Sequence, residues 1–197
     1  MSSADPRAVG AKAAARSALA ARRDGMTPDA RVTGSAAICD AAIALLAARV
    51  GPGVVVASYA AKGSEVDPAA IDQWIGARGA VIVYPRVVRG ERPLAFHAVP
   101  RAALEPAGFG LRAPAADSPA IALADIAVFL VPGLAFDRAG RRLGWGRGHY
   151  DATLARAPGA LRVGLGFGCQ VVDEVPHEAH DAALHVIITE DATLAVA

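Results

Sequence analysis

The chain has 197 residues, 54% of them hydrophobic, and a formal net charge of +1. This length and apolar content predict one folded domain over residues 1–197 and exclude an intrinsically disordered chain. The near-neutral charge, with basic residues scattered along the chain, argues against a nucleic-acid partner held by bulk electrostatics.

The cysteines and the apolar stretches indicate a cytoplasmic protein with no membrane partner. Cys39 and Cys169 are far apart and have no metal-like spacing, so reduced thiols in the cytosol are the simpler interpretation. The most apolar stretch, residues 121–136, contains Asp125 and Pro132 and is too short to span a bilayer. The Arg- and Ala-rich start is also typical of an organellar transit peptide, but we favour a helix of the mature protein.

The predicted elements alternate between helices and strands. Helices are expected at residues 7–23, from 28 to before 51, from 68, and near 152–157; strands are expected at 54–56, 81–84, 93–98, 126–131, 161–167 and 185–189. The second helix has the clearest start, because Thr27 can cap it and Pro28 follows at its first position. Residues 100–120 are rich in proline and predict an irregular surface crossing. Short apolar strands between helices predict an α/β domain with a largely parallel sheet, whose ligands gather at the carboxyl ends of the strands.

The strongest chemical pattern is the glycine–arginine loop, residues 140–151, which follows the predicted strand at 126–131. Glycines at alternate positions allow the backbone to approach a ligand and to point several N–H groups at phosphate oxygens. Arg141, Arg142 and Arg147 supply cations for a polyphosphate, and Asp151 is a carboxylate of the kind that holds Mg²⁺ beside phosphates. The alternative is a flexible surface loop with solvated arginines. The spacing matches neither the Rossmann fingerprint nor the P-loop.

The segment PGLAFDRAGRRLGWGRGHYDATL, residues 132–154, resembles the signature of the 5-formyltetrahydrofolate cyclo-ligases, also called methenyltetrahydrofolate synthetases. Further family-like blocks follow along almost the whole chain: Lys12-x3-Arg16, residues 64–67, 84–87, 108–114, 163–167 with Gln170, and 176–181. The resemblance implies an ATP- and Mg²⁺-dependent ring closure of 5-formyltetrahydrofolate to 5,10-methenyltetrahydrofolate, with release of ADP and phosphate. It also implies a single three-layer domain like that of ribose-5-phosphate isomerases and CoA transferases.

The resemblance also assigns roles to residues. The expected ATP-binding residues are Lys12, Arg16, Arg142, Leu143, Gly144, Trp145, Gly146, Arg147, Gly148, His149 and Tyr150, with Lys12 and Arg147 as catalytic cations. The expected folate-binding residues are Ala60, Glu65, Trp145 and Tyr150, and the expected Mg²⁺ ligands are Asp151 and Asp181. A carboxylate at Glu65 suits the pterin because it accepts two parallel N–H bonds. The sequence departs from the family pattern at His149, where Tyr is usual, and at Trp145, where Tyr or Arg is common.

Three alternatives remain beside this interpretation. Lys12, Arg16 and Glu65 could be ordinary solvated charges, because most charged residues on helices and loops are. A non-catalytic folate or nucleotide binder could use the same scaffold, and a sugar-phosphate isomerase of this fold would need no ATP. A zinc site at His177, His180 and Asp181 is rejected because no third soft ligand has suitable spacing beside the two histidines. We expect the protein to be a monomer.

Overall fold

The computed structural model describes the backbone of residues 6–178 and 181–196, and the side chains of these ranges from residue 14 onward. The chain opens with two long helices, α1 (Pro6–Asp24) and α2 (Pro28–Leu46). The predicted cap of α2 is confirmed, because Thr27 Oγ1 accepts the Ala30 N–H at 3.2 Å and Pro28 begins the first turn.

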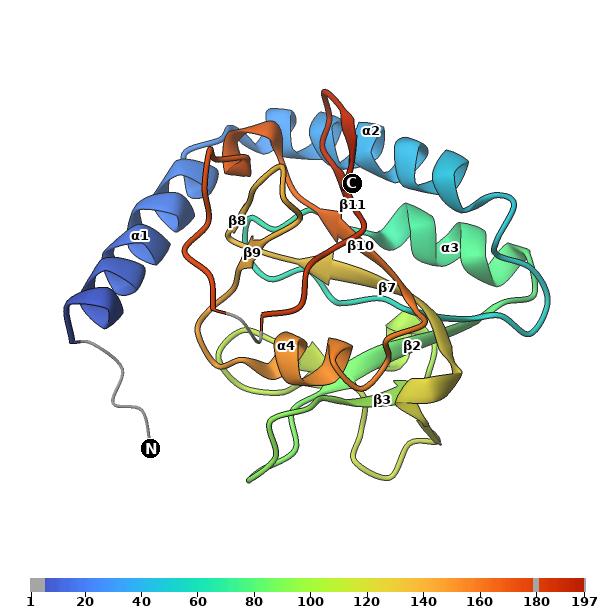
Figure 1. Cartoon of the computed structure of the whole chain (residues 1–197). Coiled ribbons are helices and arrows are strands. Elements are labelled where there is room, and N and C mark those ends of the chain that lie inside the picture. Colours follow the sequence, from blue (N-terminus) through green and yellow to red (C-terminus); the bar gives the residue numbers. More distant parts are fainter. Residues whose placement is uncertain (1–5, 179–180, 197) are drawn as a thin grey trace.

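One eight-stranded sheet forms the centre of the molecule (Figure 1), in the order β12-β11-β10-β7-β1-β2-β3-β6. The strands are β1 (Val55–Ala57), β2 (Val81–Arg86), β3 (Ala95–Ala98), β6 (Ala120–Ile121), β7 (Ile126–Pro132), β10 (Leu161–Leu165), β11 (Val186–Ile188) and β12 (Thr193–Ala195). The five central strands, from β11 to β2, are parallel, whereas β12, β3 and β6 join the two edges antiparallel. The largely parallel sheet is therefore confirmed.

Alternate residues of β7 build the two faces of the sheet, because side chains of a strand point alternately up and down. Val128 and Leu130 pack beneath α2 and α3 (Ala69–Ala77), whereas Phe129 and Val131 pack with Leu154 of α4 (His149–Leu154). Figure 1 shows α2 and α3 above the sheet and α4 below it. The three layers predicted from the resemblance are thus present.

The structure differs from the sequence-based prediction in three elements. A hairpin of β8 (Ala135–Phe136) and β9 (Arg142–Leu143), which was not predicted, leads into the glycine–arginine loop and includes its first residues. The helix expected near 152–157 begins earlier, at His149, because Gly148 has a φ of 66° and turns the chain directly into it. A further strand, β12, follows the one predicted as last.

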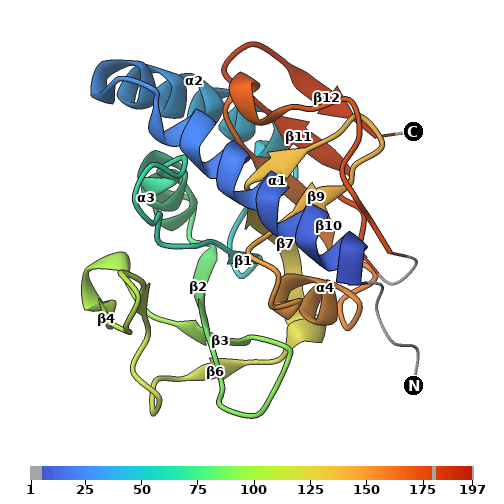
Figure 2. The ribbon, with the colours of Figure 1, turned by 90° about the vertical axis from the view of Figure 1, so that its left-hand side faces the viewer.

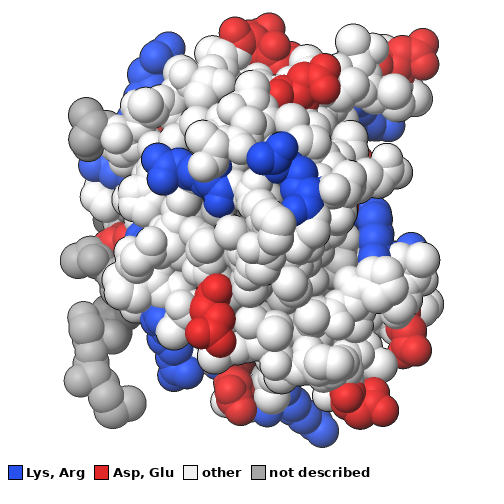
Figure 3. Space-filling model, turned by 90° about the vertical axis from the view of Figure 1, so that its right-hand side faces the viewer, with Lys and Arg blue, Asp and Glu red and all other residues white. Residues whose placement is uncertain are grey.

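The predicted irregular crossing at residues 100–120 contains only short elements. These are the 3₁₀ turn η1 (Arg101–Ala103) and the strands β4 (Glu105–Pro106), β5 (Arg112–Ala113) and β6; 3₁₀ turns also occur at η2 (Leu123–Asp125) and η3 (Gly168–Gln170). No helix in the described part of the chain is long and apolar enough to cross a membrane. The face of the molecule drawn in Figure 3 carries acidic and basic side chains interspersed, in agreement with the small net charge.

Candidate active site

Helix α1 lies against the glycine–arginine loop and brings Arg16 to it. Arg16 Nε donates to the Gly144 carbonyl at 3.0 Å, and its guanidinium packs on Gly146, where an added Cβ would lie 2.8 Å from Arg16 Cζ. Gly146 has a φ of 87°, a conformation that suits glycine. Arg16 and the loop, each of which was predicted to bind ATP, therefore lie against one another. Lys12 lies one turn earlier in α1, and its side chain is outside the described residues.

Apolar contacts fix α1 in this place. Ala15 and Leu19 pack against a small buried cluster of Ala135, Leu143 and Val175. Figure 2 shows α1 running across this side of the molecule, in front of β9. Leu143, predicted among the ATP-binding residues, is 3% exposed, so its side chain supports α1 from beneath.

Arg142 is held inside the loop by two neighbours. Its Nη2 lies 3.2 Å from Asp151 Oδ1, and its guanidinium lies over the Tyr150 ring, 5.3 Å from the centroid. Burial raises the pKa of Tyr150, and the charge of Arg142 opposes that shift. Three predicted site residues therefore meet, and the loop cation Arg142 already has a carboxylate partner.

Of the other loop residues, some have exposed side chains and some have side chains that contact neighbouring segments. Trp145 and Arg147 are exposed at the tip of the loop. The His149 ring contacts the Arg92 carbonyl, with Nδ1 at 2.7 Å, and therefore ties the start of α4 to the connection between β2 and β3. Arg141 pairs with Glu174 at 3.2 Å and lies 3.7 Å from Asp137.

The second part of the site is the loop after β1, residues 58–68, which carries Ala60 and Glu65. The Glu65 side chain is 10% exposed, and its Oε2 accepts the Lys62 backbone N–H at 2.9 Å. Burial raises the pKa of Glu65; the Lys62 N–H, the charge of Arg23 and a hydrogen-bonding interaction with Trp145 lower it. Glu65 is thus a desolvated carboxylate surrounded by donors.

The two loops meet at Trp145. Lys62 Nζ lies 5.4 Å from the centroid of the Trp145 ring, and Trp145 also interacts with Glu65. Glu65 further raises the pKa of Tyr150 through its charge. Glu65, Trp145 and Tyr150, which were predicted to contact folate, therefore form one group. β1 and β7 are adjacent parallel strands, so the loops that follow them emerge side by side at the carboxyl edge of the sheet.

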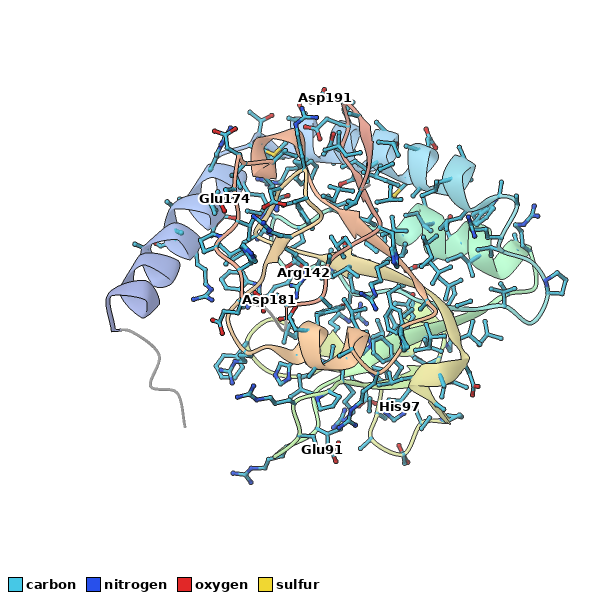
Figure 4. The ribbon with its side chains drawn as sticks, in the orientation of Figure 1. Glu91, His97, Arg142, Glu174, Asp181 and Asp191 are labelled. Atoms are coloured by element: carbon cyan, nitrogen blue, oxygen red, sulfur yellow. The ribbon has the colours of Figure 1, made fainter. Side chains whose placement is uncertain are left out.

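The candidate magnesium ligands come from two segments. Asp151 lies in the first turn of α4, whereas Asp181 accepts the Glu178 N–H at 2.8 Å in the segment before β11 (Figure 4). That segment returns to the glycine–arginine loop, where the Leu184 N–H donates to the Gly140 carbonyl at 2.8 Å. Within the described ranges no three His, Cys, Asp or Glu side chains form a metal-binding group. Asp151 nevertheless fits Mg²⁺, which binds one or two carboxylates together with phosphate oxygens and water. His180 of the rejected zinc alternative lies outside the described residues.

Sequence reasoning missed a buried polar network and a buried arginine beside this site. Tyr84 Oη donates to Asp72 Oδ2 at 2.7 Å, and Arg101 bridges Asp72 and Asp67 at 2.8 and 2.5 Å. Arg23 is 3% exposed, and its Nη1 lies 3.9 Å from Glu65 Oε1. No spacing signal identifies these residues, because their partners are 12 to 42 residues away along the chain.

Comparison with known proteins identifies the family. The model of the 5-formyltetrahydrofolate cyclo-ligase family matches residues 8–190. A 5-formyltetrahydrofolate cyclo-ligase of Mycolicibacterium smegmatis is 35% identical over 144 residues, which are 70% of this chain and 74% of that protein. The NMR structure of Aquifex aeolicus 5,10-methenyltetrahydrofolate synthetase superposes with a TM-score of 0.79 at 25% identity, over 94% of this chain and 92% of that one. A synthetase from Mycoplasma pneumoniae has the same fold, with a TM-score of 0.74, 20% identity and coverage of 91% and 98%. The chain therefore belongs to the 5-formyltetrahydrofolate cyclo-ligase family.

Proposed function

We propose that this chain catalyses the ATP- and Mg²⁺-dependent cyclisation of 5-formyltetrahydrofolate to 5,10-methenyltetrahydrofolate, with release of ADP and phosphate. One observation carries the proposal beyond family membership. The loop of alternate glycines and the desolvated carboxylate Glu65 lie at the same edge of the sheet and meet at Trp145. A phosphate-binding loop and a pterin-binding carboxylate are the two parts that this reaction requires.

The ATP side of the proposal rests on Arg16 and the glycines that it contacts. Arg16, Arg147 and Lys12 supply positive charge, and the backbone from Gly144 to Gly148 supplies N–H donors. ATP provides the phosphoryl group that makes the formyl oxygen a leaving group. Asp151 and Asp181 would hold Mg²⁺. Enzymes of phosphoryl transfer act mainly by positioning and by neutralising charge, which are the properties of these side chains.

The folate side of the proposal rests on Glu65, with Ala60, Trp145 and Tyr150 beside it. A carboxylate with few solvent contacts gains more from the N–H groups of a pterin than an exposed one would, since little water has to be displaced. The Tyr150 and Trp145 rings supply flat surfaces of the kind that aromatic ligands stack on.

The test is an assay with 5-formyltetrahydrofolate, ATP and Mg²⁺, followed by the absorbance of the methenyl product. We expect product only when all three are present. Arg16→Ala is expected to raise the apparent ATP requirement, whereas the matched control Arg22→Ala, on an exposed position of the same helix, should not. Binding of folate without product would favour the non-catalytic binder, and turnover of a sugar phosphate without ATP would favour the isomerase.

The proposal includes a monomer acting in the cytosol. The two cysteines, Cys39 and Cys169, are free, as is usual for proteins of a reducing compartment. Light scattering of the purified chain tests the monomer, and fractionation of cells tests the location.

A further inference from the structure

Arg23, at the end of α1, is a buried cation whose hydrogen bonds are incomplete. Its side chain is 4% exposed, and Nε donates to Ser64 Oγ at 2.8 Å. Among the residues that the structure describes, Nη1 has no hydrogen-bond partner. A buried donor left unpaired is costly, and more so when it is charged. Such a group indicates a missing acceptor.

The place of the missing acceptor is defined by Glu65. Arg23 Nη1 lies 3.9 Å from Glu65 Oε1, which is too long for a hydrogen bond. Arg23 Nη1 is a donor and Glu65 Oε1 is an acceptor. At this separation the two can bind two neighbouring atoms of one flat ligand: Nη1 binds an atom with a lone pair, and Oε1 binds an atom that carries a hydrogen. Ser64, bonded to Arg23, directly precedes Glu65, so both groups are fixed by the same short segment.

We propose that Arg23 is a ligand-binding residue, and that Arg23 and Glu65 together recognise a lactam edge, –NH–C(=O)–, in a fused ring. Glu65 accepts the ring N–H, and Arg23 Nη1 donates to the adjacent carbonyl oxygen. This rests on the proposed function, in which the ring is the 2-amino-4-oxo pterin of the folate. It adds a residue that reads the 4-oxo group.

The charges of the pair agree with this assignment. Arginine stays protonated in proteins and can only donate, so it rejects a ring position that carries another donor. Glu65 alone would accept from either ring, from the ring N–H of a 4-oxo ligand or from the exocyclic amino group of a 4-amino ligand. Trp145 forms a hydrogen-bonding interaction with Glu65 and is 55% exposed. Its side chain can therefore move towards solvent when a ligand N–H replaces it as the donor to Glu65.

The test compares two ligands by direct calorimetric binding without ATP: 5-formyltetrahydrofolate and its 4-amino-4-deoxy analogue. The wild-type chain should prefer the 4-oxo ligand by about 10- to 100-fold, the effect of one hydrogen bond to a charged group. Arg23→Met should lose this preference, mainly through weaker binding of the 4-oxo ligand. Arg22→Met, on an exposed position next to it, should leave both affinities unchanged.

The outcomes separate the inference from the proposed function. If the wild-type chain binds neither ligand, the proposed function fails. If it binds the 4-oxo ligand and Arg23→Met keeps the same preference, Arg23 is only structural and the inference is overturned, even if both affinities fall. Should Arg23→Met not fold, Arg23→Gln takes its place, because its amide can donate to a 4-oxo group or accept from a 4-amino group and should therefore also lose the preference. A reduced preference supports the inference, and an unchanged one overturns it.

Discussion

Two features of Gly146 favour glycine at this position: the backbone conformation of the glycine–arginine loop and the close approach of the Arg16 side chain. An alanine there meets two obstacles: a φ of 87° and a Cβ 2.8 Å from Arg16 Cζ. Gly148 offers a matched comparison, because it has a φ of 66° but no atom within 4 Å of an added Cβ. An alanine at Gly148 therefore causes backbone strain, whereas an alanine at Gly146 causes backbone strain and also displaces Arg16.

We predict that Gly146→Ala raises the apparent KM for ATP by clearly more than Gly148→Ala does. Both changes should cost about 1 kcal/mol of stability through strain. The measurement is steady-state kinetics with ATP varied, beside thermal unfolding. In an Arg16→Ala background the two alanines should have similar effects, since the side chain that Gly146 accommodates is gone. A persistent difference there would show that Arg16 is not the cause.

Glu65 predicts a pH dependence of stability. Burial raises its pKa above the ordinary value of 4.5, so the folded state binds the proton more tightly than the unfolded state does. The contribution of Glu65 to stability is therefore present at low pH and lost as pH rises through its folded pKa. Glu65→Gln, which cannot ionise, should gain stability relative to the wild type over the pH range that begins at the ordinary pKa of 4.5 and extends up to the raised pKa of Glu65.

Urea unfolding of both chains across this range measures the effect. Glu105→Gln, at an exposed position, is the control and should show no such trend. A relative loss of stability by Glu65→Gln as pH rises would mean that the donors around Glu65 outweigh its desolvation.

At the scale of elements, an arginine of η1 forms ion pairs that hold the loop carrying Glu65 against α3. Arg101 bridges the exposed Asp67 of this loop and Asp72 of α3, which is 4% exposed. Burial raises the pKa of Asp72, and hydrogen bonds from Ser58, Tyr84 and Arg101 oppose it. Removing the cation would leave a buried carboxylate beside two neutral side-chain donors, Tyr84 and Ser58.

We predict that Arg101→Met destabilises the fold by about 3 kcal/mol at neutral pH, the usual cost of leaving a buried charge unpaired. The double variant Arg101→Met/Asp72→Asn should recover much of this loss. Denaturant unfolding of the single and double variants measures the coupling free energy between Arg101 and Asp72. Equal destabilisation in both would show that packing, and not charge, is what Arg101 contributes.

The sequence predicts those elements whose causes are local. The Thr27–Pro28 start of α2 and the five apolar parallel strands depend on neighbouring residues, and they are confirmed. The early start of α4 depends on the φ of Gly148, which the sequence does not state. The burial of Arg23 depends on Ser64, 41 residues away. The sequence therefore identifies candidate residues that share one motif, whereas Arg23, which only the fold brings beside Glu65, carries no such signal.

At the scale of the whole molecule, the sheet order explains why the two candidate half-sites lie together. β1 and β7 pair in parallel, with Val56 opposite Val128, and their following loops carry Glu65 and the glycines. α1 then joins the two loops, with Arg16 on Gly144 and Arg23 beside Glu65. A folate held on the first loop would present its formyl group to a phosphate held on the second.

This arrangement predicts direct transfer of the formyl oxygen. If the formyl group and the γ-phosphate are adjacent, the formyl oxygen takes the phosphoryl group and leaves with it when N10 closes the ring. Substrate labelled with ¹⁸O in the formyl group should then deliver its label to inorganic phosphate, which mass spectrometry detects. An enzyme that hydrolyses ATP only to drive a conformational change would place solvent oxygen in the phosphate. Unlabelled phosphate alongside genuine methenyl product would contradict direct transfer and leave the family membership untouched.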